Sequence, residues 1–201
     1  MKSHIVYIAC IAALVTATSC AAADPIRVEV SGIGTGTLNG SSFSNATFLI
    51  FGLGDTSNVE QPLPDIFRII PESSGVSVNG GGTSLFDDEI QIAVNQSQPA
   101  DDQFNPAAGF GNITQGRSLA FVASDQFGDY FLDNSIGPIS GPFEESFSPG
   151  VAHSTQEGSF ELTSVSSIEF RAVVVAVPEP SACSFLLAYW AFCTSRRKRH
   201  V

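Results

Sequence analysis

The fold class follows first from a short segment near the amino-terminal end of the chain, Ile26-Arg27-Val28-Glu29-Val30. Apolar and polar residues alternate along it, so that a β-strand would send the apolar side chains to one face and the polar side chains to the other. The stretch therefore predicts a half-buried strand. Further segments rich in β-branched and aromatic residues are also predicted as strands: 47–51, 66–70, 76–78, 90–94, 119–123, 130–132, 159–162 and 168–177.

Clusters of turn-forming residues, such as Asn79-Gly80-Gly81-Gly82, separate these segments. No window of a dozen residues carries a helical stripe, and the best helical candidate is a short turn near 125–130. Fourteen phenylalanines lie within residues 24–177 and are expected to fill the core. The predicted fold class is all-β: a single antiparallel β-sandwich, with an N-terminal signal helix and a short C-terminal transmembrane helix outside it.

The composition of residues 24–177 narrows the range of functions. This region has four arginines, nineteen acidic residues, no lysine and no cysteine, which gives a net charge of −15. Without cysteine or lysine, thiol and Schiff-base catalysis are excluded, and the domain cannot form disulfides. The acidic surface is a poor partner for nucleic acid, and it favours divalent cations and solubility outside the cell.

Residues 1–23 are predicted to be a signal peptide. Lys2 supplies the positive end and Ile5 to Val15 the apolar region, while small residues mark a cleavage site at Ala21, Ala23 and Asp24. This prediction makes the Sec translocon a partner. Lipidation at Cys20 is the alternative, and the sequence leaves it open.

Residues 178–201 are predicted to be a membrane-directed tail. Prolines on both sides of Glu179 exclude a helix there, and the run 181–195 that follows contains no charge. Glu179 and Arg196 are 17 residues apart, which as a helix is roughly 25 Å against a hydrocarbon core of about 30 Å. The basic stop that ends the run keeps its end on the cytoplasmic side: Arg196, Arg197, Lys198 and Arg199. A buried C-terminal helix is the alternative interpretation.

The order of these parts resembles the PEP-CTERM sorting signal of Gram-negative bacteria. The match rests on the motif Val177, Pro178, Glu179 and Pro180, the apolar run and the arginine-rich end. The resemblance implies recognition and removal of the tail by exosortase, an integral-membrane transpeptidase-like protease, and an association with exopolysaccharide. The same type of tail is sometimes labelled the C-terminal domain of an ice-binding protein, a label that describes the tail and no activity.

The resemblance extends into the domain. The segments 31–40, 46–48, 130–132, 135–141 and 169–174 are similar to a group of secreted PEP-CTERM proteins. The domain of that group resembles a β-sandwich without assigned catalysis. The resemblance therefore implies a non-catalytic β-sandwich.

Candidate catalytic residues are few. His153 is the only histidine in residues 24–177, and the nearest candidate nucleophile is Ser118, in Gly116-Arg117-Ser118-Leu119-Ala120. That stretch lacks the final glycine of a nucleophile elbow and leads into a predicted strand. The simpler interpretation of His153 is a solvated loop residue. Paired carboxylates for glycoside hydrolysis stay open, although the domain has no Trp and only one Tyr to stack on sugar rings.

Acidic clusters in predicted loops are the candidate cation ligands. Asp87, Asp88 and Glu89 are adjacent, Asp101 and Asp102 form a pair, and Asp125, Asp129 and Asp133 recur every four residues. Calcium takes six to eight oxygen ligands from such loops, but no cluster has the Asp-x-Asp-x-Asp-Gly spacing. The sequence predicts no cofactor. A structural Ca²⁺ bound by Asp87, Asp88 and Glu89 is the open alternative.

These observations predict an exported protein without enzymatic activity. The chain is expected to pass the inner membrane transiently and to reach the outer surface or the extracellular matrix, where its role is structural or adhesive. Two alternatives stay open: a secreted hydrolase with paired carboxylates and a Ca²⁺-dependent adhesion module. The sequence does not identify a ligand or an oligomeric state.

Overall fold

The alternating stretch at the start of the chain forms part of strand β1 (Pro25–Leu38), as predicted. The structure is a computed structural model, and it describes residues 24–97, 106–112, 116–143 and 151–175. The side chains of Ile26, Val28 and Val30 are completely buried or nearly so. Arg27 and Glu29 lie on the opposite face, where they form an ion pair of 2.7 Å. The alternation thus sets which face of the strand enters the core.

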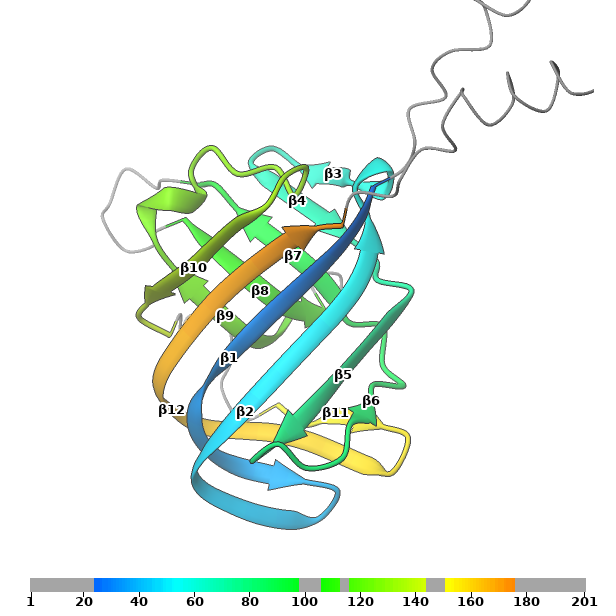
Figure 1. The fold of residues 1–201 in the computed structure, drawn as a ribbon, viewed down its shortest axis with the longest axis vertical. Helices are drawn as coiled ribbons and strands as arrows, with labels where there is room; N and C mark the ends of the chain where they lie inside the picture. The colour runs from blue at the N-terminus through cyan, green and yellow to red at the C-terminus, as the bar shows by residue number, and fades with distance from the viewer. Residues whose placement is uncertain (1–23, 98–105, 113–115, 144–150, 176–201) are drawn as a thin grey trace, which may run out of the picture. The chain divides into compact units, whose positions relative to one another are not determined.

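Strand β1 lies inside the first of two antiparallel sheets, which we call sheet A (Figure 1). Sheet A has seven strands in the order β10-β12-β1-β2-β5-β6, and β11 pairs with β12 beside this path. Its other strands are β2 (Ser41–Asp55), β5 (Ser73–Val78), β6 (Ser84–Leu85), β10 (Ile136–Gly141), β11 (His153–Thr155) and β12 (Gly158–Val174).

The second sheet, sheet B, has five shorter antiparallel strands in the order β3-β4-β7-β8-β9. Every residue of β8 is buried, and so is every residue of β9 after Arg117. Four of the six residues of β8 are alanine or glycine. Their small size lets neighbouring segments pack closely against both faces of the strand. The strands of sheet B are β3 (Glu60–Leu63), β4 (Ile66–Ile69), β7 (Gln91–Asn95), β8 (Ala107–Asn112) and β9 (Arg117–Ala123).

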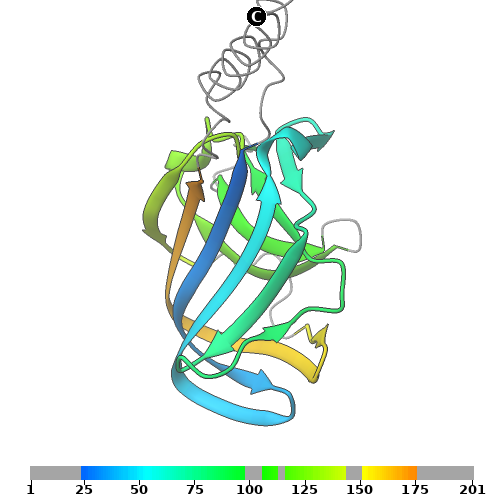
Figure 2. The ribbon, with the colours of Figure 1, turned by 45° about the vertical axis from the view of Figure 1, so that its right-hand side comes forward.

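The two sheets share one hydrophobic core. Side chains from β1, β2 and β12 belong to the same buried cluster as side chains from β4, β7, β8 and β9, and Figure 2 shows the green strands of sheet B behind sheet A. The approach is close at Gly52 of β2, where a Cβ atom would lie 2.9 Å from Cε1 of Phe110 in β8. Phenylalanines fill much of this core, as the composition predicts; among the fully buried ones are Phe110, Phe127, Phe160 and Phe170.

The long strands of sheet A bend strongly along their length (Figure 1). The pairing of β1 with β12 shifts register between Ile33 and Gly34, and again between Thr35 and Gly36. Such bulges increase the local twist of a strand. At Gly36 a Cβ atom would collide with the carbonyl oxygen of Glu161 in β12, so only glycine permits this approach.

The strand predicted at 130–132 is wrong. Tyr130 and Leu132 are buried and Phe131 between them is 41% exposed, which reproduces the alternation of a strand. The segment is instead a loop that follows the 3-10 helix η3 (Asp125–Phe127), and Leu132 has a positive φ of 62°. The two buried side chains anchor the loop on the core. Burial, and then the charge of Asp133, raises the pKa of the Tyr130 phenol.

Other predicted boundaries also need correction. The segment 159–162 and the residues 168–174 of the segment 168–177 belong to one continuous strand, β12. Residues 176 and 177 lie outside the described residues. The predicted turn near 125–130 is confirmed by η3. Strands β3, β6, β8, β10 and β11 have no counterpart among the predicted segments.

The first and last strands begin and end at the same end of the fold (Figure 1). Ile26 pairs with Val174 across β1 and β12, and the backbone N–H of Val175 donates to the carbonyl oxygen of Pro25 over 2.8 Å. The turns at 38–41 and 155–158 lie at the other ends of these strands. Both chain junctions of the described domain therefore lie side by side.

Candidate functional site

Most of the predicted sorting and cleavage residues lie outside the described residues. These are the signal helix with Ala21 and Ala23, the motif at 177–180, the apolar run 181–195 and the basic stop at 196–199. Asp24 is the first described residue, and its carbonyl oxygen accepts a hydrogen bond from the N–H of Thr56 over 3.1 Å. Within the part of the chain that the structure describes, no helix is long and apolar enough to cross a membrane.

The acidic cluster Asp87, Asp88 and Glu89 lies between β6 and β7, beside β11. Asp88 Oδ2 accepts a hydrogen bond from the backbone N–H of Ser154 over 2.7 Å. The N–H of Asp87 donates to the Ser154 carbonyl over 3.0 Å. These two bonds hold the segment against β11, so the first role of Asp88 is to satisfy a backbone donor.

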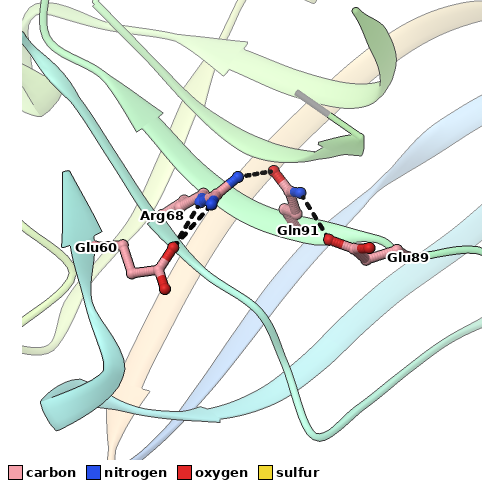
Figure 3. A network of polar contacts seen from close by, with 4 residues as sticks. All are labelled: Glu60, Arg68, Glu89 and Gln91. Carbon is pink, nitrogen blue, oxygen red and sulfur yellow. Dashed lines mark hydrogen bonds and ion pairs between the residues drawn. The ribbon is translucent and has the colours of Figure 1, made fainter. Parts of the chain in front are cut away.

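Glu89 takes part in a different network, shown in Figure 3. Its Oε1 accepts from Nε2 of the fully buried Gln91 over 3.2 Å, and Gln91 Oε1 accepts from Arg68 over 3.5 Å. Arg68 in turn donates twice to Glu60 Oε2, over 3.0 and 2.8 Å. The network joins the edge strand β3 to β4 and β7.

Calcium binding at this cluster stays a prediction. The described residues contain no group of three or more His, Cys, Asp or Glu side chains placed to hold a metal ion. The carboxylates of Asp88 and Glu89 bond to separate partners, a backbone amide and the Gln91 side chain. Six to eight oxygens would have to converge for Ca²⁺.

His153 is buried, so its interpretation as a solvated loop residue is wrong. It begins strand β11, which pairs with β12, and its Nε2 lies 3.3 Å from the carbonyl oxygen of Ser118 in β9. A carbonyl only accepts, so Nε2 carries the proton and Nδ1 carries a lone pair in the neutral ring. Strand β9 is the edge of sheet B. His153 therefore satisfies a carbonyl of that edge strand.

The other ring nitrogen of His153 faces a carboxylate. Nδ1 makes no hydrogen bond with any described residue and lies 3.8 Å from Asp88 Oδ2. Burial lowers the pKa of His153, and the charge of Arg117 acts in the same direction, whereas the hydrogen bond to Ser118 and the charge of Asp88 oppose the shift. Because burial is the largest cause, the ring is neutral at neutral pH.

Ser118, His153 and Asp88 are thus neighbours, although they are far apart in the sequence. Their geometry differs from that of a catalytic triad. The imidazole bonds to the backbone carbonyl of Ser118, while the buried Ser118 hydroxyl has no hydrogen-bond partner in the described part of the chain. A general base must lie within hydrogen-bond reach of the hydroxyl that it deprotonates. The arrangement ties β11 to β9, and it does not activate the serine.

Paired carboxylates are the other catalytic alternative. A groove on sheet A contains one carboxylate, Glu169, and a smaller hollow beside β3 contains one, Glu60. A glycosidase needs two carboxyl groups on either side of the scissile bond. Neither cavity provides that pair.

A groove crosses sheet A, and no sequence motif marks it. It has a volume of about 530 Å³ and crosses the strands β10, β12, β1 and β2 next to the point where Ser166 of β12 has no paired residue in β1. A series of spaced serines in separate strands was the available signal, but only the strand register shows that they converge. Five of its eleven lining residues carry hydroxyls: Ser31, Thr47, Ser140, Ser166 and Ser167. Glycines and apolar residues, Ile33 among them, make up the rest together with Glu169.

Comparison of the chain with models of protein families, with curated proteins and with solved structures gives no match.

Proposed function

We propose that the protein is an exported, C-terminally sorted protein of the cell surface or extracellular matrix, with a structural or adhesive role and no catalysis. In this proposal the described domain is a β-sandwich formed by sheets A and B, and residues 178–201 are the sorting tail. The exported chain uses the Sec translocon and an exosortase-like membrane protease, and its matrix partner is an exopolysaccharide.

The position of the two chain junctions is the observation that carries this proposal. Ile26 and Val174 are paired in neighbouring strands, so both junctions leave the domain at one end. A tail inserted in a membrane would then hold the domain by that end. The turns at 38–41 and 155–158 lie at the end of sheet A far from the two junctions.

The described residues around the histidine of the domain have structural roles. The imidazole of His153 bonds to a backbone carbonyl, and the acidic side chains nearest to it serve backbone and amide donors. The net charge of −15 for residues 24–177 also suits a protein that stays soluble without lysine or disulfides.

Cell fractionation tests the proposal. The full chain and a variant that lacks residues 178–201 are expressed in a Gram-negative host with an active exosortase, and the mass of the mature protein is measured in each fraction. We expect the full chain in the surface or matrix fraction with both ends removed. The truncated variant should be released into the periplasm or medium. An uncleaved C-terminus on a membrane-bound chain would contradict sorting and indicate a plain anchor.

A further inference from the structure

We propose that the groove on sheet A binds a stretch of neutral, polyhydroxylated polymer, such as a polysaccharide chain. The inference rests on the proposed function, because it names the binding site for the matrix partner. It depends on the register of four strands, on hydrogen-bonding groups that have no partner in the described domain, and on the charge of the groove.

Two rows of side chains form the walls of the groove. Ser140 and Ser31 both pair with Glu169, so these three side chains lie in one row on one face of sheet A. Ile33 pairs with Ser167 on one side and with Thr47 on the other, which makes the second row. Residues two positions apart in a strand lie about 6.6 Å apart and share a face, so the rows leave a channel between them.

The floor of the channel is main chain. Gly141, Ile168, Gly32 and Phe48 are paired across the same four strands, between the two rows. The side chains of Ile168 and Phe48 point the other way and are only 4% and 2% exposed. With strands about 4.8 Å apart, the channel runs for roughly 14 Å across the sheet. A ligand in it would be an extended chain that crosses the strands.

The walls carry hydrogen-bonding groups without partners. The hydroxyls of Ser31, Thr47, Ser140 and Ser167, and the carboxylate of Glu169, bond to no other residue in the described domain. A hydroxyl both donates and accepts, and a carboxylate accepts at two oxygens. The hydroxyls of a sugar chain provide the complementary set, and the aliphatic side chain of Ile33 provides contact for its C–H surface.

The charge of the groove favours a neutral polymer over an anionic or a cationic one. Among the described residues that line it, Glu169 is the only charged side chain, and none is a cation. An anionic polymer would be repelled by that carboxylate and by the net charge of −15 of the domain. A cationic polymer would bind the acids of the whole surface, with no preference for a groove of hydroxyls. A neutral polyhydroxylated chain is the ligand that the groove itself favours.

Affinity electrophoresis of the full chain, in non-ionic detergent, tests the inference. The native gel contains hydroxyethylcellulose as the neutral probe, and parallel gels contain alginate or polylysine. We expect retardation by the neutral polymer. Thr47→Tyr, which fills the channel, should weaken binding at least about ten-fold, and Glu169→Gln should weaken it by about the same factor because hydrogen bonds to charged groups are the stronger ones.

Ser164→Tyr is the matched control. Ser164 is an exposed residue of β12 outside the groove, three positions before Ser167, so this variant should be retarded like the unaltered chain. The melting temperature of each variant shows whether it is folded, and Glu169→Gln tests the site if Thr47→Tyr fails to fold. No retardation by hydroxyethylcellulose, equal retardation of groove and control variants, or retardation by polylysine alone would overturn the inference. Cell fractionation tests sorting independently, so the two failures are distinguishable.

Discussion

Sheet A and sheet B differ in the length of their strands and in how many of their faces are buried. The central strands β1, β2 and β12 of sheet A have 14, 15 and 17 residues, and one face of each is exposed or half-buried. That face is mostly polar on β1 and β12, whereas on β2 it includes Leu49, Phe51 and Leu53. The described strands of sheet B are much shorter, and β8 and β9 are buried on both faces. The sheets therefore rely on different physical signals to fix their register.

In sheet A, alternation fixes the register, since a slip by one residue would turn the apolar side chains of β1 into solvent. In strands β8 and β9 of sheet B, a slip would exchange one buried face for another, and only the sizes of the side chains oppose it. Glycines and alanines in β8 and the large ring of Phe110 provide that size pattern. We infer that sheet B is the more sensitive to changes of volume and sheet A the more sensitive to changes of polarity.

Phe110→Ala is expected to have the largest effect. The ring is fully buried in the core that both sheets share. Truncation of a buried phenylalanine costs about 3–5 kcal/mol of the free energy of unfolding, because transfer energy is lost and a cavity remains. Urea denaturation of the full chain in detergent measures this cost.

Phe51→Ala is the control on the outer face of sheet A. Its half-buried ring lies 5.7 Å from the guanidinium of Arg27, outside the core that the two sheets share. We expect a cost of about 1 kcal/mol or less. Equal costs for the two variants would mean that sheet B is not the size-sensitive sheet.

Gly52→Val tests the same contact from sheet A. A Cβ atom at this position would lie 2.9 Å from Cε1 of Phe110 and 3.1 Å from Cδ1 of Ile92, so valine overfills the space between the sheets. Overpacking costs about 1–3 kcal/mol of the free energy of unfolding. Denaturation with urea measures it, with Gly82→Val as the control because nothing lies within 4 Å of a Cβ there.

The double variant Gly52→Val with Phe110→Leu sharpens this test. If the clash with Phe110 is the cause, the smaller leucine makes room, and the two costs are less than additive. Additive costs would mean that other neighbours oppose the valine side chain at position 52.

The same contrast explains how much of the fold the sequence predicts. The half-buried strands of sheet A are found because Ile26 to Val30 and 168–174 alternate. Strand β8 is not found, because Ala107 to Asn112 has both faces buried and so shows no alternation. The false strand at 130–132 arises for the opposite reason: two loop residues alternate because they anchor the loop on the core.

The sites depend on contacts that sequence patterns do not contain. Asp88 and His153 are 65 positions apart, and their proximity follows from the pairing of the Asp87 segment with β11. The groove takes residues from four strands, and the register of β1 with β12 and β2 decides which of them share a row. The residue types identify which side chains are polar. Only the strand register shows which of these side chains lie together.

The smallest expected change in stability concerns His153. This residue joins β11 of sheet A to the edge strand β9 of sheet B. Its unfolded pKa is about 6.5, and burial lowers the folded pKa. Below about pH 6.5 the unfolded chain therefore binds more protons at this ring than the folded chain does. The contribution of the neutral ring to stability is complete above about pH 6.5, and it is lost as the pH falls toward the folded pKa.

His153→Gln tests the hydrogen bond to Ser118 in the absence of a side chain that takes up a proton. The glutamine amide can still donate to the Ser118 carbonyl but does not take up a proton, so we expect a cost of about 1 kcal/mol at about pH 7.5 from poorer packing and geometry. This deficit should narrow at about pH 5, where the unaltered chain has lost part of its stability. Melting temperatures at the two pH values measure it.

Asp88→Asn provides the matched comparison for the same ring. It keeps an oxygen for the N–H of Ser154 but removes the charge that opposes the shift, so the folded pKa of His153 should fall further. This variant should lose more stability between about pH 7.5 and pH 5 than the unaltered chain, because the ring stays neutral to lower pH in the folded state. If neither variant changes the pH dependence, the folded and unfolded pKa values of His153 are equal, and burial of the ring does not link stability to pH.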